Sequence, residues 1–161
     1  MLQLKNIKRG SQRGFTLLEV LLVVAIIAIL AGIVIIAINP GKQLGDTRNA
    51  QRQADVTTTL NAVYQYALDN NGTMPATITA TPTEICITGT AGGTCTTNAV
   101  IDLSVVTTSG KYIASFPKDP QCPAGCNATG TGYRISKDAT TGRITVTAIN
   151  PEQGKTITVT R

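Results

Sequence analysis

The sequence contains no histidine. This absence excludes a histidine-based catalytic triad, a histidine proton relay and a histidine metal ligand. The G-x-S-x-G, P-loop and Rossmann glycine patterns are missing as well. We therefore expect a protein that is not an enzyme, carries no cofactor and has no catalytic residues.

Acidic residues are absent from the first 14 positions. The net charge is +5, but from Phe15 onward 10 Lys and Arg stand against 9 Asp and Glu. The excess therefore belongs to a short basic segment, in which the cations are Lys5, Lys8, Arg9 and Arg13. Because it is so short, it indicates membrane orientation rather than a nucleic-acid surface.

Charge is also absent from Val20–Ile38, a run that as a helix is ~28 Å long and matches the hydrocarbon thickness of a bilayer. A cleaved secretory signal has a shorter apolar region and a small-x-small cut site, which this run lacks. The basic residues on its N-terminal side predict that this side stays in the cytoplasm. The remainder is then outside the inner membrane.

Glu19 is the one acid near the start of the apolar run. An ionised acid inside a membrane helix costs on the order of 2.5–3.5 kcal/mol and generally has a partner. A plain membrane anchor does not explain this residue. The alternative is that Glu19 only marks the end of the helix.

The stretch Arg13-Gly14-Phe15-Thr16-Leu17-Leu18-Glu19-Val20 resembles the processing motif of type IV prepilins and type II secretion pseudopilins. The resemblance implies that a prepilin peptidase cuts after Gly14 and that Phe15 becomes the methylated N-terminus. It also implies that Glu19, then the fifth residue, pairs with the terminal amine of a neighbouring subunit and sets the register of assembly.

The same resemblance implies the partners and the location. The partners are a homopolymer or mixed filament of pilins, the prepilin peptidase and an inner-membrane assembly platform, with nucleic acid unlikely unless through DNA uptake. The chain is expected to be a single-pass inner-membrane protein before assembly, with its head outside, and then part of an extracellular or periplasmic filament.

Cysteine is absent from the leader and the apolar run, and all four cysteines follow: Cys86, Cys95, Cys122 and Cys126. An even number in a polar context predicts disulfides and an oxidising compartment. Three pairings are possible, of which we expect the local Cys86–Cys95 and Cys122–Cys126. Reduced thiols or a zinc site are the alternatives, although the spacings lack paired C-x2-C knuckles.

The sequence Asn39-Pro40-Gly41 predicts a kink or short break in the helix. An amphipathic helix of roughly 28 residues then follows, expected over 43–70. Its apolar face should pack on a sheet, with Leu60, Val63, Tyr64, Ala67 and Leu68 on that face. Its polar face is expected to carry Arg48, Arg52 and Asp55.

Residues 73–110 are rich in Thr and Gly and predict loops, with a short strand near Ile85–Thr88. Alternating apolar residues then predict antiparallel strands around Tyr133–Ile135, Ile144–Ala148 and Ile157–Val159, separated by turns. Phe116-Pro117-Lys118-Asp119-Pro120 resembles a P-x-D-P loop found in this family. Asp102, Asp119 and Asp138 offer oxygen donors, but their spacing forms no EF-hand loop, and we expect no metal.

The expected fold is α+β, a pilin fold in which a long N-terminal helix packs on a small antiparallel sheet. Its expected parts are a cleaved basic leader (1–14), a transmembrane and assembly helix (15–38), an amphipathic helix continuing the spine (39–72) and an exported β-rich head (73–161). The expected function is a structural subunit of a type IV pilus-like filament. The alternatives are a type II secretion pseudopilin and, less favoured, a membrane-anchored binding module that does not polymerise.

Overall fold

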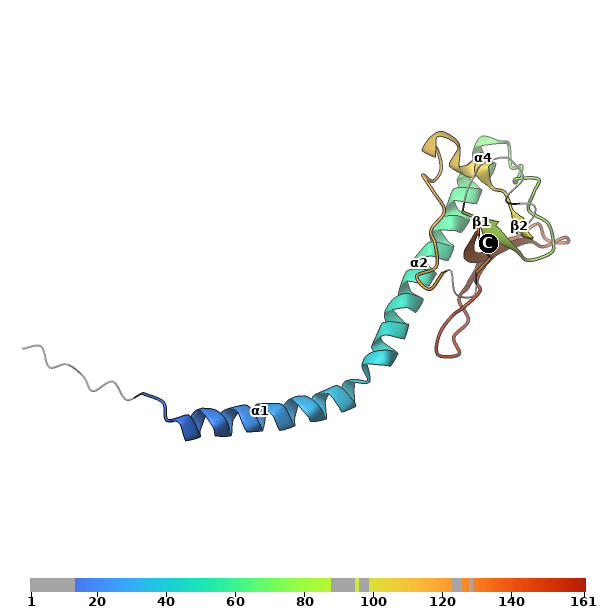
Figure 1. Ribbon diagram of the computed structural model, residues 1–161. Coiled ribbons are helices and arrows are strands. Elements are labelled where there is room, and N and C mark those ends of the chain that lie inside the picture. Colours follow the sequence, from blue (N-terminus) through green and yellow to red (C-terminus); the bar gives the residue numbers. More distant parts are fainter. Residues whose placement is uncertain (1–13, 88–94, 96–98, 123–125, 128) are drawn as a thin grey trace, which may run out of the picture. The chain divides into compact units, whose positions relative to one another are not determined.

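A computed structural model of the chain describes residues 14–87, 95, 99–122, 126–127 and 129–161. The chain divides into two units, with the boundary between Pro40 and Gly41 (Figure 1). The basic residues Lys5, Lys8, Arg9 and Arg13 lie outside the described residues. Each unit is considered by itself below.

Most of the described part of the first unit is helix α1 (Leu17–Ile38). Thr16 precedes it with extended backbone, and its side-chain oxygen accepts a hydrogen bond from the Glu19 N–H at 3.2 Å. The helix ends at Asn39, which has a left-handed backbone with φ of 48°. Pro40 disfavours a helical conformation in the residue before it, and asparagine tolerates the left-handed region. The expected interruption is therefore one residue long.

Helix α2 (Pro40–Asp69) opens the second part of the chain with proline at its first position, where a missing N–H costs nothing. Its buried face includes Leu60, Val63 and Ala67, as the periodicity predicts. The prediction was wrong for Leu68, whose side chain is 80% exposed. Leu68 directly follows the buried Ala67, and consecutive residues lie about 100° apart around a helix, so its side chain points away from the core. Val56 is buried on the core side of α2.

The buried face also includes Arg52, so the assignment of this residue to the polar face was wrong. Its side chain has no exposed surface. Asp55 is only half-buried and Arg48 lies at the edge of the face. A cation on the apolar side of an amphipathic helix requires partners from the packed domain, and these are described below.

The sheet has five strands in the order β2-β1-β3-β4-β5. Their bounds are β1 Thr83–Cys86, β2 Val100–Ile101, β3 Gly130–Lys137, β4 Ile144–Ala148 and β5 Thr158–Thr160. The β1–β3, β3–β4 and β4–β5 pairs are antiparallel, whereas β1 and β2 are parallel. The sheet is therefore mixed rather than wholly antiparallel. The short strand expected near Ile85–Thr88 begins two residues earlier, at Thr83.

A short helix, α4 (Ser104–Thr107), and a 3-10 turn, η1 (Thr108–Gly110), follow β2. The connection from β1 to β2 is about a dozen residues long, which is the length that a parallel crossover requires. It is also the segment that the sequence pattern described only as loop. The parallel edge therefore had no periodic signal in the sequence.

The core of the second unit lies between α2 and one face of the sheet, and Figure 1 shows α2 alongside the strands. Strand β4 buries alternate residues, Ile144, Val146 and Ala148, as its sequence pattern predicts. They join Tyr133 and Ile135 from β3 in one cluster with Val56, Leu60 and Val63 from α2. A second, smaller cluster consists of Cys86, Cys95 and Val100.

Candidate functional site

Glu19 and Phe15, which the sequence motif singles out, lie at the start of α1. Gly14 and Phe15 precede the helix, and the Phe15 side chain is 82% exposed. Glu19 is the third helical residue. Its backbone N–H donates a hydrogen bond to the Thr16 side chain. The residues form a T-x-x-E pattern, which is a sequence signature of a helix N-terminus. A carboxylate in this position is stabilised by the helix dipole.

The helix dipole is the support that α1 itself gives to the Glu19 carboxylate. Among the residues that the structure describes, no ion pair involves the Glu19 carboxylate. The dipole effect is worth about 0.3–1 kcal/mol at exposed sites. That is less than the roughly 2.5–3.5 kcal/mol cost of a charge in a membrane helix.

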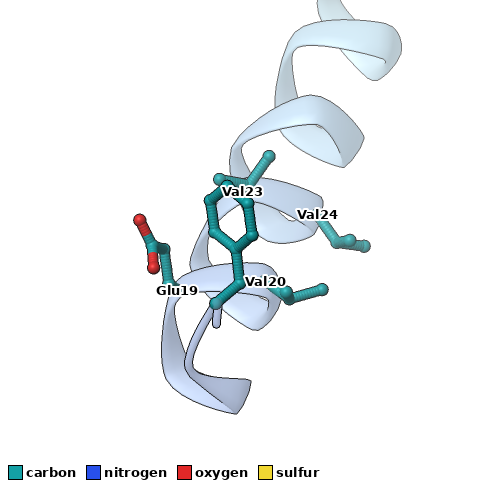
Figure 2. A pocket seen from close by; sticks show the side chains of 5 residues that line it. Glu19, Val20, Val23 and Val24 are labelled. Carbon is teal, nitrogen blue, oxygen red and sulfur yellow. The ribbon is translucent and has the colours of Figure 1, made fainter. Parts of the chain in front are cut away.

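An apolar recess lies beside this carboxylate. Its walls are Phe15, which lies two residues before α1, and four side chains of the helix, namely Glu19, Val20, Val23 and Val24. In Figure 2, Glu19 lies on one flank of the helix, and Val20 and Val24 project from another. Such a recess, with one negative group at its edge, complements a ligand that joins an apolar body to one positive charge.

The rest of α1 offers a continuous apolar surface. None of its 22 residues is buried, and Glu19 is its only charged residue. By length and composition, α1 is the one helix in the described part of the chain that can cross a bilayer. The chain thus has one N-terminal apolar helix that is compatible with membrane anchoring.

A buried ion-pair cluster fixes α2 in the second unit. Arg52 and Asp119 both have fully buried side chains and form a two-pronged ion pair, with N–O distances of 2.6 and 3.0 Å. The other Arg52 donors reach oxygens of Gln121 at 2.7 Å and of Asn49 and Glu152 at 3.0 Å. All five guanidinium N–H groups are therefore engaged, and the bonds to Asp119 raise the pKa of Arg52.

Glu152, in the turn between β4 and β5, completes this cluster. It forms a second two-pronged pair, with Arg48, at 2.6 Å for both N–O contacts. Its backbone also exchanges two hydrogen bonds of 3.0 Å with the side chain of Asn49. The hydrogen bonds from Arg48 and Arg52 lower the pKa of Glu152 to about 2. The turn is therefore clamped to three residues of α2.

Asp55 is a third acid at this surface. The Tyr133 hydroxyl donates to its carboxylate at 2.6 Å. Burial raises the pKa of Asp55, and the Tyr133 hydrogen bond opposes this effect. Burial and the bond to Asp55 also raise the pKa of Tyr133.

The three aspartates considered as oxygen donors serve separate structural roles. Asp119 pairs with Arg52, Asp102 accepts from the Ser104 N–H at 2.8 Å, and Asp138 accepts from the N–H groups of Thr140 and Thr141. Within the described ranges, no three potential metal-ligating side chains come together.

The structure joins Cys86 to Cys95 and Cys122 to Cys126, the local connectivity expected from the sequence. Their Cα–Cα distances are 5.8 and 5.6 Å, within the usual range for disulfides. The second bridge lies beside the ion-pair cluster at Gly132. A Cβ added there would lie 2.6 Å from the Asp119 Cβ and 3.0 Å from both sulfurs. Gly132 therefore permits this close packing.

The ion-pair cluster escaped the sequence analysis, although two signals for it were present. Arg52 lies four residues before Val56 and eight before Leu60, on the buried side of the helix. Asp119 lies in the P-x-D-P loop, where the sequence suggested a family resemblance and an oxygen donor but not an ion-pair partner for Arg52. A cation in phase with the apolar face and an acid in a fixed loop together predict a buried pair.

The N-terminal segment matches a known family motif. Residues 9–35 match the motif described as the prokaryotic N-terminal methylation motif. The resemblance to type IV pilins and type II secretion pseudopilins is therefore confirmed for this part of the chain. No solved structure matches the chain.

Curated relatives share part of the chain. It is 39% identical over 64 residues to the type II secretion system core protein G of Aeromonas hydrophila, which is 40% of this chain and 43% of that protein. It is 40% identical over 60 residues to the protein of the same name from Escherichia coli strain K12, covering 37% of this chain and 40% of that one. The chain thus spans less than half the length of these relatives.

Proposed function

We propose that this chain is a structural subunit of a type IV pilus-like filament, processed by a prepilin peptidase and polymerised through α1. Gly14 is the residue before the cut, and Phe15 is the methylated N-terminus of the mature subunit. Neither catalysis nor a cofactor is part of this function. The supporting observation is that α1 is wholly exposed and apolar except for Glu19, which has no ion-pair partner among the described residues.

Glu19 supports assembly because its charge has a higher cost without a partner than with one. In a bundle of apolar helices no water solvates the carboxylate, and a cation from a neighbouring subunit removes this cost. Cutting after Gly14 creates such a cation, the terminal amine of Phe15. The phenyl ring and the amine together form the apolar body with one positive charge that suits the recess beside Glu19.

The proposed topology follows from charge and cysteine placement. The leader cations Lys5, Lys8, Arg9 and Arg13 hold the N-terminus in the cytoplasm. The unit after Pro40 is then outside the inner membrane, where its two disulfides are stable. The partners proposed are other pilin subunits, the peptidase and an inner-membrane assembly platform.

Between the two kinds of filament, the partial similarity to type II secretion core protein G favours a secretion pseudopilus. The aligned part covers less than half of those proteins, so a surface pilus stays an alternative. Deleting the gene separates them. Loss of exported proteins from the medium with no change in surface filaments supports the pseudopilus, and the reverse supports the pilus.

The filament itself is tested by complementation. A deletion strain should lack a filament that returns when the wild-type chain is expressed, as seen by electron microscopy with antibodies against the head. A processed chain that stays dispersed in the membrane of an otherwise assembly-competent strain would contradict polymerisation and favour the membrane-anchored binding module.

A further inference from the structure

An open recess lies where the C-terminal end of α2 meets the segment that contains α4 and η1 (Figure 1). Its volume is about 620 Å³, which is within the usual range for small-ligand sites. Its walls include Tyr66 and Asn70 at the end of α2, and Thr108, Ser109 and Tyr112 in the segment that follows β2. The function proposed above makes no use of this recess.

Two tyrosine rings form the apolar part of the recess. The rings of Tyr66 and Tyr112 lie at 76° to each other with their centroids 5.7 Å apart, an edge-to-face arrangement that is favourable for aromatic pairs. Both side chains are half-buried and pack against the main core cluster. The Tyr112 hydroxyl also donates to the Asp69 carboxylate at 3.1 Å. The rings are therefore held in place before a ligand arrives, which lowers the entropy cost of binding.

Polar groups able to bond a ligand lie around the rings. Among the residues that the structure describes, none bonds the Ser109 hydroxyl or the side-chain carbonyl of Asn70. The amide nitrogen of Asn70 donates to the Tyr66 carbonyl at 2.7 Å, which fixes the direction of this side chain. Ser109 has a left-handed backbone with φ of 55°. Strained residues of this kind are concentrated at ligand sites.

The recess carries no unpaired charge. Lys111 lies on its wall, with the ammonium 4.9 Å from the centre of the Tyr112 ring. This ammonium pairs with Asp69 at 2.7 Å, and its hydrogen bond to Asp69 raises the pKa of Lys111. A phosphate-rich ligand requires cations that are free to neutralise it. The recess therefore suits a neutral ligand.

We propose that this recess binds a neutral oligosaccharide, with one sugar ring stacked on a tyrosine ring. A β-linked glucose ring carries its hydroxyl groups around its equator, so its two flat faces consist of C–H bonds. Such a face packs on an aromatic ring, because the negative face of the ring attracts the partly positive hydrogens. The hydroxyl groups at the edge of the sugar can donate to the Asn70 carbonyl and exchange a hydrogen bond with Ser109.

A proline-rich peptide is another ligand that aromatic-lined grooves bind. Proline has no N–H group, so such a peptide presents mainly carbonyl acceptors. The Asn70 carbonyl is itself an acceptor, and the Tyr112 hydroxyl already donates to Asp69. A sugar hydroxyl supplies the donor that the Asn70 carbonyl requires, so the polar groups of the recess favour the oligosaccharide.

Isothermal titration calorimetry of the full chain, in a detergent without a sugar headgroup, tests the proposal. The probes are cellotetraose, a β-linked glucose tetramer, and chitotetraose, its N-acetylglucosamine counterpart. We expect at least one of them to bind with millimolar affinity or better. Tyr112→Leu removes the aromatic face but keeps an apolar side chain, and should weaken binding at least about tenfold. Tyr64→Leu is the matched control, because Tyr64 is also half-buried but does not line the recess, and it should bind as the wild type does.

Ser109→Gly provides a second variant that separates binding from folding. Glycine adopts the left-handed backbone of position 109 without strain. The variant should therefore keep the thermal stability of the wild type while binding the sugar several-fold more weakly, because the hydroxyl is lost. A purely structural role of Ser109 would not give this combination. If Tyr112→Leu fails to fold, this variant decides the test.

Three outcomes would overturn the proposal. The wild type could bind neither probe, the variants Tyr112→Leu and Ser109→Gly could bind as tightly as the wild type, or an oligoproline peptide could bind through Tyr112 while the sugars do not. The last outcome would assign the recess to peptides. None of these measurements depends on filament assembly, so failure of the sugar site leaves the proposed function unaffected.

Discussion

Arg52 is a cation with no exposed surface, and its partners account for this placement. Every guanidinium N–H meets an oxygen, and the carboxylate of Asp119 takes two of them. Such a pair contributes little relative to an apolar replacement, but breaking it leaves one charge buried alone. Its role is therefore to fix one orientation of α2 against the P-x-D-P loop.

Arg52→Met or Asp119→Asn should lower the free energy of unfolding of the head by about 3–5 kcal/mol, because each leaves its partner unpaired. Denaturant unfolding of the detergent-solubilised chain, followed by circular dichroism, measures this change. Lys111→Met, which removes a cation from the solvent-exposed pair with Asp69, is the control and should have a much smaller effect. Equal losses for Arg52→Met and Lys111→Met would contradict the role given to the buried pair.

Unlike Arg52, Glu19 has no ion-pair partner among the described residues. Glu19→Gln keeps a polar side chain of similar size and removes the charge. It should insert into the membrane at least as well as the wild type, because the cost of the charge disappears. We expect it to assemble poorly, since the pair that sets register is lost. Filament counts and membrane fractionation measure the two effects, and unchanged assembly would show that Glu19 has no register role.

At the level of elements, the turn between β4 and β5 depends on pH through Glu152. Its pKa falls to about 2 in the folded chain from an ordinary value of 4.5. The unfolded chain thus binds more protons between these values, and this contribution to stability is present above pH 4.5 and lost as the pH falls toward 2. Asp55 acts in the opposite direction, because its raised pKa favours proton binding by the folded chain.

Unfolding measured from pH 6 to pH 2 on the wild type and Glu152→Gln tests this assignment. The wild type should lose more stability between pH 4.5 and 2, because the variant has no carboxylate to protonate. Parallel curves for the two proteins would show that the Glu152 clamp does not contribute to acid sensitivity.

The two disulfides should differ in their effect on α2. Cys122–Cys126 packs beside Asp119 at Gly132, whereas Cys86–Cys95 lies in the second cluster with Val100. The Cys122→Ser/Cys126→Ser double variant should increase hydrogen exchange in α2 near Arg52 more than the matched Cys86→Ser/Cys95→Ser variant. Non-reducing peptide mapping of the wild type should recover the two local bridges. Cross-paired peptides, or equal exchange in the two variants, would contradict this account.

Elements with a regular apolar pattern were predictable from the sequence, and elements held by single contacts were not. The charge-free run of α1 and the alternation of Ile144, Val146 and Ala148 directly reflect burial with a fixed period. Strand β2 has two residues and pairs in parallel after a long crossover, so no local period identifies it. The burial of Arg52 depends on Asp119, 67 residues further along the chain, and only the fold brings them together.

The predicted functional site divides in the same way. The motif around Gly14, Phe15 and Glu19 is local, so the sequence alone is enough to predict it. The Glu152 clamp depends on which side of α2 faces the turn between β4 and β5. Leu68 was assigned to the core because it lies eight residues after Leu60, a spacing that helical periodicity places near the same face.

At the scale of the whole molecule, the two units divide the work of the proposed function. The second unit pairs its most deeply buried charges internally, in the Arg52–Asp119 pair and, beside it, the Arg48–Glu152 pair. Helix α1 has no buried residue, and its one acid has no ion pair, within the part of the chain that the structure describes. In the proposed function a membrane covers this surface before assembly and further copies cover it afterwards, and the proposed cut after Gly14 supplies the amine that pairs with Glu19.

The most direct measurement is therefore mass spectrometry of the N-terminal peptide in purified filaments. We predict a peptide that begins at Phe15 and carries one N-terminal methyl group, recovered from the filament fraction. A chain found there with Met1 and its leader still attached would contradict the account, as would a processed chain that never enters that fraction.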